Sequence, residues 1–207
     1  MSVTVAVRRR ARRGEGVQLV ALATRLLQQR VTRAEPLSVA RVFQSLSSSD
    51  DVLLLSVWES REAYWAAVAS DHAQEQLDPL SDREPERHFF RQLALDEAPG
   101  RPVAVADCAI LRCPPANVAA LIADIQQRLR PMVQVAPGFV LRYLGQDEDD
   151  STRLLLFRGW DALEALEDFR IERALHFEAE WAKHGATVER FVGRSRAVVE
   201  SPSHHTP

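Results

Sequence analysis

The chain has 207 residues, of which 46% are hydrophobic and 27% are charged, and its formal net charge is −3. This composition is that of a globular protein with an apolar core, and the length fits one large or two small domains. The small net charge provides no general attraction to nucleic acids or to anionic membranes. No apolar run approaches the roughly 18 residues of a membrane-spanning helix, and the early arginines stand in the wrong order for a signal peptide. We therefore expect a cytoplasmic protein that binds neither nucleic acid nor membrane.

The first half of the chain predicts the order strand, helix, strand, strand, helix, strand. The β-rich run Val3–Arg9 alternates as a strand does. Apolar residues then recur at helical spacing over Val17–Val31, and Pro36 ends this helix. Ser60 is a suitable N-cap for a second helix that runs to about Leu77. The other expected strands cover residues 37–46, 52–58 and 88–95.

An arginine-rich cluster, Arg8-Arg9-Arg10-Ala11-Arg12-Arg13, follows the first strand. One interpretation is a solvated strand end whose charge prevents pairing at a sheet edge. The other is a positive patch that attracts an acidic ligand. We favour the solvated strand end.

The second half predicts the same order of elements. Turn-forming residues from Asp96 to Pro102 separate the halves. We expect a first repeat over residues 1–97, a linker over 98–102, a second repeat over 103–200 and a disordered tail over 201–207. Pro114-Pro115 begins the third helix and Pro131 ends it. The remaining expected elements are strands over 103–113, 138–144, 153–160 and 187–199 and a helix over 162–183.

Two tryptophans mark an internal repeat. Trp58 and Trp160 each end an apolar run, each is followed by an acidic residue, and they lie about half of the chain apart. A βαββαβ unit forms a ferredoxin-like, four-stranded antiparallel sheet with both helices on one face. The central strands are apolar on both sides, so the second face of each sheet also needs a cover. The expected fold class is α+β, with two tandem ferredoxin-like repeats packed sheet to sheet.

Several segments resemble one known family. The residues Ala136-Pro137-Gly138-Phe139-Val140, the run from Leu154 to Asp161, and the junction from Trp58 to Tyr64 resemble the antibiotic biosynthesis monooxygenase type of dimeric α/β barrel. The resemblance covers both halves and implies a tandem fusion that forms an intramolecular dimeric α/β barrel. The family contains oxygenases, isomerase-like proteins and proteins without known activity, so the fold alone does not decide the function.

Two subfamilies can be compared residue by residue. The cofactor-independent, quinone-forming oxygenases carry Asn, Trp and Tyr at this junction; Trp58 and Tyr64 match, whereas Leu54 occupies the Asn position. The second repeat has Leu156 at the Asn position. The haem-degrading members need Trp and His at positions that fall near Ala67 and Leu77 here, so haem cleavage is not expected.

The resemblance implies a substrate pocket between the sheet and the helices of the first repeat. In this hypothesis Trp58 stacks on the substrate, Tyr64 orients a substrate oxygen, and Trp65 adds to the wall. The second repeat has Leu166 and Glu167 at the positions of Tyr64 and Trp65, so the pocket is expected in the first repeat. The alternative for each of these aromatic residues is a packing role in the core.

Two histidines are candidates for a catalytic base. His72 lies in the second expected helix and His88 begins the last strand of the first repeat, where Phe89 and Phe90 add an apolar wall. An imidazole titrates near neutral pH and can take a proton from a phenolic substrate. A surface or capping role is the alternative for both histidines.

The sequence thus gives two hypotheses of different classes. The first is a cofactor-independent monooxygenase-like enzyme that oxidises a planar aromatic phenol or anthrone, with catalytic residues Tyr64, His72 and His88. The second is a non-catalytic barrel of the same fold that binds a small ligand or serves as an interaction domain. Neither a cofactor nor a metal is expected, and the expected assembly is a monomer or a loose homodimer.

Overall fold

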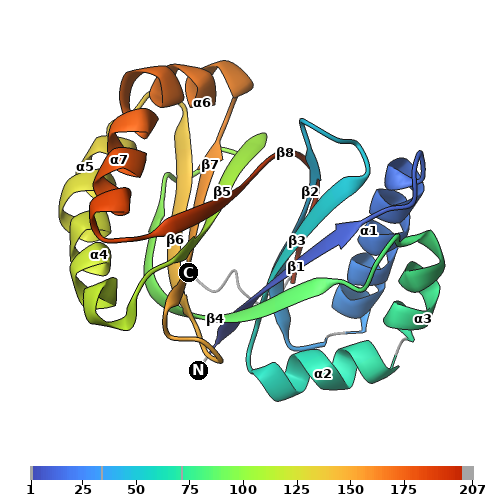
Figure 1. Cartoon of the computed structure of the whole chain (residues 1–207). Coiled ribbons are helices and arrows are strands. Elements are labelled where there is room, and N and C mark those ends of the chain that lie inside the picture. The colour runs from blue at the N-terminus through green and yellow to red at the C-terminus, as the bar shows by residue number, and fades with distance from the viewer. Residues whose placement is uncertain (1, 34, 71, 202–207) are drawn as a thin grey trace. The chain divides into compact units, whose positions relative to one another are not determined.

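The computed structural model describes residues 2–33, 35–70 and 72–201, and at residues 173–176 only the backbone. Two compact units make up the chain (Figure 1). The first unit comprises residues 1–91 and 193–207, and the second comprises residues 92–192. The predicted tail lies, from residue 202 on, outside the described residues.

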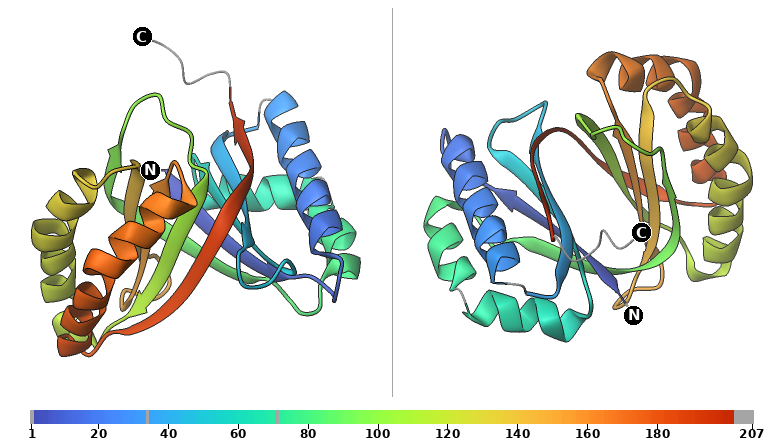
Figure 2. Two further views of the ribbon diagram at one scale, coloured as in Figure 1. Left: turned by 90° about the horizontal axis from the view of Figure 1, so that it is seen from above. Right: turned by 180° about the vertical axis from the view of Figure 1, so that it is seen from behind.

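The first unit contains a sheet with the strand order β4-β1-β3-β2, and all its neighbouring strands are antiparallel. Helices α1, α2 and α3 cover one face of this sheet (Figure 2). The last part of β8, from residue 193 on, pairs with β2 at the end of this order. The elements are β1 (Val3–Arg10), α1 (Gly16–Thr32), β2 (Leu37–Ser45), β3 (Asp51–Trp58), α2 (Arg61–Ser70), α3 (Ala73–Leu77), a 3-10 turn (Asp78–Leu80) and β4 (Glu86–Glu97).

The second unit repeats this arrangement, with β5 and β6 paired on either side of β7. Its elements are β5 (Val105–Arg112), a 3-10 turn (Pro115–Asn117), α4 (Val118–Asp124), a π-helical turn (Ile125–Leu129), α5 (Arg130–Gln134), β6 (Phe139–Asp147), β7 (Arg153–Trp160), α6 (Leu163–Phe169), a second π-helical turn (Arg170–Ala174), α7 (Leu175–Lys183) and β8 (Thr187–Glu200).

Strands β4 and β8 each run from one unit into the other. β4 begins in the first unit and ends in the second, whereas β8 begins in the second and ends in the first. The hydrogen-bonded strand order β1-β3-β2-β8-β5-β7-β6-β4 is that of a closed barrel. The expected fold class, α+β with two tandem ferredoxin-like repeats, is therefore confirmed. The limits of the repeats, at residues 97 and 103, stay a prediction.

The second helix of the first repeat is shorter than predicted. Its N-cap is confirmed, because the backbone N–H of Ala63 donates to Ser60 Oγ at 3.1 Å. The helix does not run on to Leu77: α2 ends at Ser70, His72 has a φ of 50°, and α3 begins at the next residue. A left-handed residue cannot continue a right-handed helix. The prediction of one continuous helix is wrong at this point.

Pro131 does not end the third helix, contrary to expectation. The helix continues through α5 to Gln134, and the π-helical turn Ile125–Leu129 directly precedes the proline segment. A proline in a regular α-helix clashes with the carbonyl group four residues earlier. The wider π turn changes the local backbone at this carbonyl and accommodates the ring. Within the described ranges, no helix combines the length and the apolar character needed to cross a membrane.

Candidate functional site

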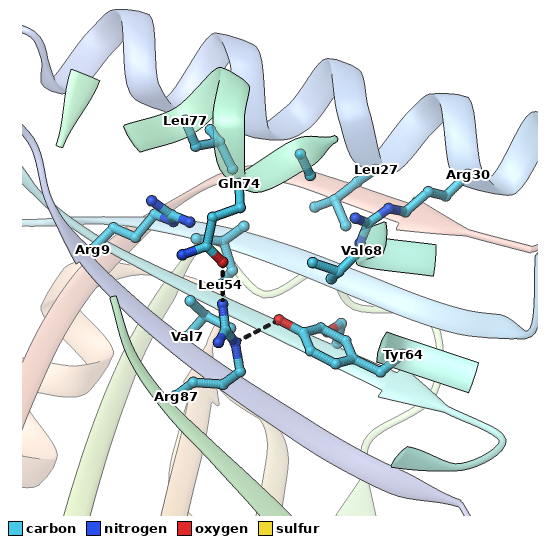
Figure 3. Close-up of a pocket in the computed structure, with 12 residues that line it drawn as sticks. Val7, Arg9, Leu27, Arg30, Leu54, Tyr64, Val68, Gln74, Leu77 and Arg87 are labelled. Atoms are coloured by element: carbon cyan, nitrogen blue, oxygen red, sulfur yellow. Dashed lines mark hydrogen bonds between the residues drawn. The ribbon is translucent and has the colours of Figure 1, made fainter. Parts of the chain in front are cut away.

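A pocket of about 50 Å³ lies in the first unit, between its sheet and its helices (Figure 3). Three arginines line it: Arg9 of β1, Arg30 of α1 and Arg87 of β4. None of its lining residues is an aspartate, a glutamate or a histidine. The other lining residues are apolar or neutral: Val7, Leu27, Leu54, Ser56, Tyr64, Val68, Ala73, Gln74 and Leu77.

Tyr64 and Arg87 meet on the wall of the pocket (Figure 3). Arg87 Nε donates a hydrogen bond to Tyr64 Oη at 2.8 Å, and Arg87 Nη2 donates to Gln74 Oε1 at 3.2 Å. The phenol oxygen of Tyr64 accepts from Arg87, so its own proton remains able to donate to a ligand oxygen. The neutral side chains of Tyr64 and Gln74 therefore hold the Arg87 guanidinium at the pocket wall, where the Tyr64 hydroxyl can also donate to a ligand.

Arg9 adds a second charge, and this one is buried. Its side chain is 3% exposed and donates to Asp78 Oδ1 and to Ser81 Oγ, each at 3.0 Å. Burial lowers the pKa of Arg9, the hydrogen bond and charge of Asp78 raise it, and the charge of Arg87 lowers it again. A guanidinium stays protonated at neutral pH in spite of such shifts. The pocket thus contains two like charges close enough to interact.

The interpretation of the arginine-rich cluster as a solvated strand end that prevents edge pairing is wrong for Arg8 and Arg9. Strand β1 is not a sheet edge, because β3 and β4 pair with it on its two sides. Arg8 forms an ion pair with Asp51, and Arg9 lines the pocket. The alternative, a positive patch for an acidic ligand, fits the position of Arg9.

Trp58 supports the pocket from behind. Its side chain is completely buried, and its indole N–H donates to Ser56 Oγ at 2.9 Å. Its ring lies edge-on to Tyr64, with 5.5 Å between the centroids, and Arg30 lies 5.5 Å from its centroid. Trp58 is not among the lining residues. It packs against Tyr64 and Arg30, which do line the pocket.

Trp65 and Phe89 gather around Tyr64 but do not line the pocket. Their ring centroids lie 5.2 Å and 5.5 Å from that of Tyr64. Trp65 is 40% exposed, and the guanidinium of Arg87 lies 4.7 Å from its ring centroid. Phe89 is buried, and Arg61 lies 4.2 Å from its ring centroid. Both aromatic residues hold the Tyr64–Arg87 pair from outside the pocket.

His88 and Phe90 lie on the opposite face of the sheet from the pocket. Successive side chains of a strand point to opposite faces. Arg87 lines the pocket and Phe89 packs in the core beneath the helices, so His88 and Phe90 point away from both. Their rings lie 6.0 Å apart on that second face. The structure therefore does not bring His88 and Phe90 together with Tyr64.

His72 also lies outside the pocket. It precedes α3 in a left-handed conformation, and its side chain is 68% exposed. Its Nδ1 lies 3.3 Å from Glu75 Oε1. Neither predicted histidine lines the pocket, so the geometry does not support the assignment of a histidine base.

The sequence interpretation missed the polar residues of the pocket: Arg30, Gln74 and Arg87. Arg87 had a usable signal, because strand alternation places it on the same face as Phe89. Gln74 had none, because its position depends on the helix break at His72. Arg30 lies within the first helix and looks in the sequence like any polar residue of a helix surface.

The second repeat fills the equivalent position with an ion pair. Trp160 corresponds to Trp58, and by strand register Asp107 and Arg158 correspond to Val5 and Ser56. Arg158 Nη2 donates to Asp107 Oδ2 at 2.5 Å, and both side chains are completely buried. Asp107 Oδ1 also lies 3.3 Å from Arg190 Nε. The two repeats therefore share a fold but not a site.

The sequence comparison agrees with the resemblance noted above. Residues 2–77 match the family described as antibiotic biosynthesis monooxygenase. No curated protein sequence gives a significant match. The family match covers the strand-to-helix junction and every lining residue of the pocket except Arg87.

Solved structures of the same type share this fold over almost the whole chain. A proposed monooxygenase from Fusobacterium nucleatum is 10% identical, with a TM-score of 0.77 over 96% of this chain and 94% of that one. An anthrone oxidase-like protein is 12% identical, with a TM-score of 0.74 over 98% and 94%. The haem-degrading enzyme from Listeria monocytogenes is 11% identical, with a TM-score of 0.52 over 94% and 99%. At these identities the likeness shows a monooxygenase-like fold.

Proposed function

We propose, from the match of residues 2–77 to the antibiotic biosynthesis monooxygenase family, that this protein is a cofactor-independent, monooxygenase-like enzyme. Its substrate is a planar aromatic phenol or anthrone, as the anthrone oxidase-like structural relative suggests. One observation carries the proposal: Arg87 Nε donates to Tyr64 Oη at 2.8 Å on the wall of a pocket without acidic lining residues. This pair can stabilise negative charge that develops on a substrate oxygen.

The chemistry needs only the substrate and dioxygen. The ring carbon to be oxidised loses a proton, and the resulting enolate transfers electrons to dioxygen. One oxygen atom ends as the new carbonyl oxygen on that carbon, and the other leaves as water together with both hydrogens of the carbon. Dioxygen accepts all the electrons, so the reaction requires no external reductant.

The residues of the pocket act on the enolate. The Tyr64 hydroxyl donates a hydrogen bond to the enolate oxygen, and the charge of Arg87 stabilises it, as preorganised donors do in oxyanion holes. The lining residues include no histidine and no carboxylate. The acidity of the substrate is therefore raised by stabilisation of the enolate, and water accepts the proton.

Oxygen consumption by the full-length chain with an anthrone tests this proposal. The Tyr64→Phe variant is expected to lose about 10²-fold in kcat, the usual effect of removing one donor of this kind. An oxygen electrode measures the rate after subtraction of the spontaneous oxidation of the anthrone. Tyr143→Phe in the second repeat makes the same chemical change elsewhere and is expected to keep the parent rate. Equal turnover of Tyr64→Phe and the parent protein would rule out the proposed site.

The alternative function, a non-catalytic barrel that binds a small ligand, has one observation in its favour. The pocket of about 50 Å³ is well below the roughly 300 Å³ at the lower end of ligand sites. A planar tricyclic substrate enters only if side chains such as Leu77 and Val68 move. Saturable binding of an anthraquinone without any oxygen uptake would favour this alternative.

The proposal includes the partner and the location. A small aromatic molecule is the expected partner, and the cytoplasm is the expected compartment. Fractionation of source cells checks the location, and detection of the protein outside the cytoplasmic fraction would contradict it.

A further inference from the structure

The charge of the pocket points to a particular chemical group. Asp78 pairs with Arg9, and Glu35 Oε2 lies 4.0 Å from Arg30 Nε, so these two arginines have carboxylates near them. The hydrogen-bond partners of Arg87, by contrast, are the neutral side chains of Tyr64 and Gln74. A guanidinium held by neutral groups at a pocket wall favours an anion as its ligand.

The size of the pocket limits this anion. One water molecule needs roughly 10–15 Å³ of such space, so a pocket of about 50 Å³ holds roughly three to five water-sized atoms. A carboxylate group, with one carbon and two oxygens, fits this space. A tricyclic ring system does not.

The donors around the pocket also suit a carboxylate. Nε and Nη2 of Arg87 each make one hydrogen bond within the protein, and a guanidinium carries five N–H groups. The hydroxyl proton of Tyr64 adds a further donor. Figure 3 shows the guanidinium groups of Arg9 and Arg87 on either side of the Gln74 side chain.

We propose that the pocket binds the carboxylate group of a small aromatic acid, held by the guanidinium of Arg87 and the hydroxyl of Tyr64. The inference rests on the proposed function for the place of the site: the carboxylate occupies the position beside Arg87 and Tyr64 that the enolate oxygen takes in that function, so an aromatic acid is expected to compete with the anthrone rather than to be oxidised. The carboxylate occupies the inner pocket, and the ring extends through the opening. Arg9 contributes long-range attraction, because its own hydrogen bonds go to Asp78 and Ser81.

A titration of the isotopically labelled full-length chain with benzoate tests the proposal without any catalytic turnover. We expect saturable shifts of the Arg87 Nε–H resonance in ¹H–¹⁵N spectra. Benzamide has the same shape without the charge and is expected to cause no saturable shift. Equal binding of benzamide and benzoate, or an unchanged Arg87 resonance at saturation, would overturn the proposal.

Variants at position 87 separate charge from geometry. Arg87→Gln is expected to weaken benzoate binding by at least about 10-fold. Arg87→Lys keeps the charge but loses the planar guanidinium, so its affinity for benzoate is expected to lie between those of the parent and Arg87→Gln. Arg83→Gln is the matched control, because Arg83 is exposed, pairs with Glu86 and does not line the pocket. Thermal unfolding confirms that each variant is folded. If folded Arg87→Gln binds benzoate as tightly as the parent, the inference is wrong.

The two proposals fail in different ways. Benzoate binding that depends on Arg87, without oxygen uptake with any anthrone, would support the carboxylate site and contradict the oxygenase. Oxygen uptake with a neutral anthrone, without saturable benzoate binding, would support the oxygenase and contradict the carboxylate site. Competition by inorganic phosphate as strong as that by benzoate would also contradict a site selective for carboxylates.

Discussion

Single residues distinguish the two repeats more clearly than the fold does. Ser56 accepts the indole N–H of Trp58, whereas Arg158 stands at the same place before Trp160 and is itself a donor. Neither the indole N–H of Trp160 nor Nε of Arg158 has a hydrogen-bond partner in the described part of the chain, and both are buried. Burial lowers the pKa of Arg158, and the charge of Asp107 raises it. Ser56 leaves space for the pocket in the first repeat, whereas the larger Arg158 fills the equivalent space in the second repeat.

The buried Arg158–Asp107 pair makes a stability prediction. Arg158→Met alone leaves Asp107 buried with Arg190 as its remaining charged neighbour, 3.3 Å away, and is expected to lower the free energy of unfolding by about 3 kcal/mol. The double variant Asp107→Leu, Arg158→Met replaces the pair by apolar groups of similar size and is expected to be as stable as the parent or more stable. Arg190 keeps an ion pair with Glu178 in both variants. Urea unfolding followed by tryptophan fluorescence measures the difference, and a double variant as unstable as the single one would contradict the argument.

At the level of elements, the break between α2 and α3 positions the polar wall of the pocket. Tyr64 comes from α2, Gln74 comes from α3, and Arg87 joins them from β4. The break depends on His72, whose φ of 50° lies in the region that favours glycine. Its imidazole lies outside the pocket, so the backbone conformation of His72 matters more than its chemistry.

Substitution of His72 tests this distinction. His72→Gly is expected to raise the free energy of unfolding by about 0.5–1 kcal/mol relative to His72→Ala, because glycine adopts the left-handed conformation without a Cβ penalty. Both variants are expected to keep the oxygen consumption of the parent. Loss of turnover in both variants would restore His72 as the catalytic base.

The order of strands and helices was predictable from hydrophobic periodicity, whereas the expected location of a pocket beneath the helices came from the family resemblance. Tyr64 was found because the resemblance implies a tyrosine at this position after Trp58. Arg87 was not, because its contact with Tyr64 spans 23 positions and exists only where β4 pairs with β1. The helix break at His72 and the continuation through Pro131 depend on tertiary packing, which local residue preferences do not contain.

For the whole molecule, the closed strand order predicts how the chain assembles. The order closes on itself, so the sheet has no free edge for pairing with a second copy. The chain of 23.3 kDa is expected to be a monomer or a loose dimer. Light scattering at several protein concentrations measures this, and a tetramer that persists on dilution would contradict it.

The pairing of the end of β8 with β2 affects how the first unit folds during synthesis. Residues from Gly193 on complete the sheet beside β2, although β2 itself is synthesised before residue 50. A ribosome adds about 5–20 residues per second, so the edge of β2 waits roughly 8–30 seconds for its partner strand. During that interval the nascent chain exposes an unpaired strand, the kind of edge that aggregates. The first unit therefore cannot complete its sheet until the residues after Gly193 have been synthesised, although most of its sequence emerged long before.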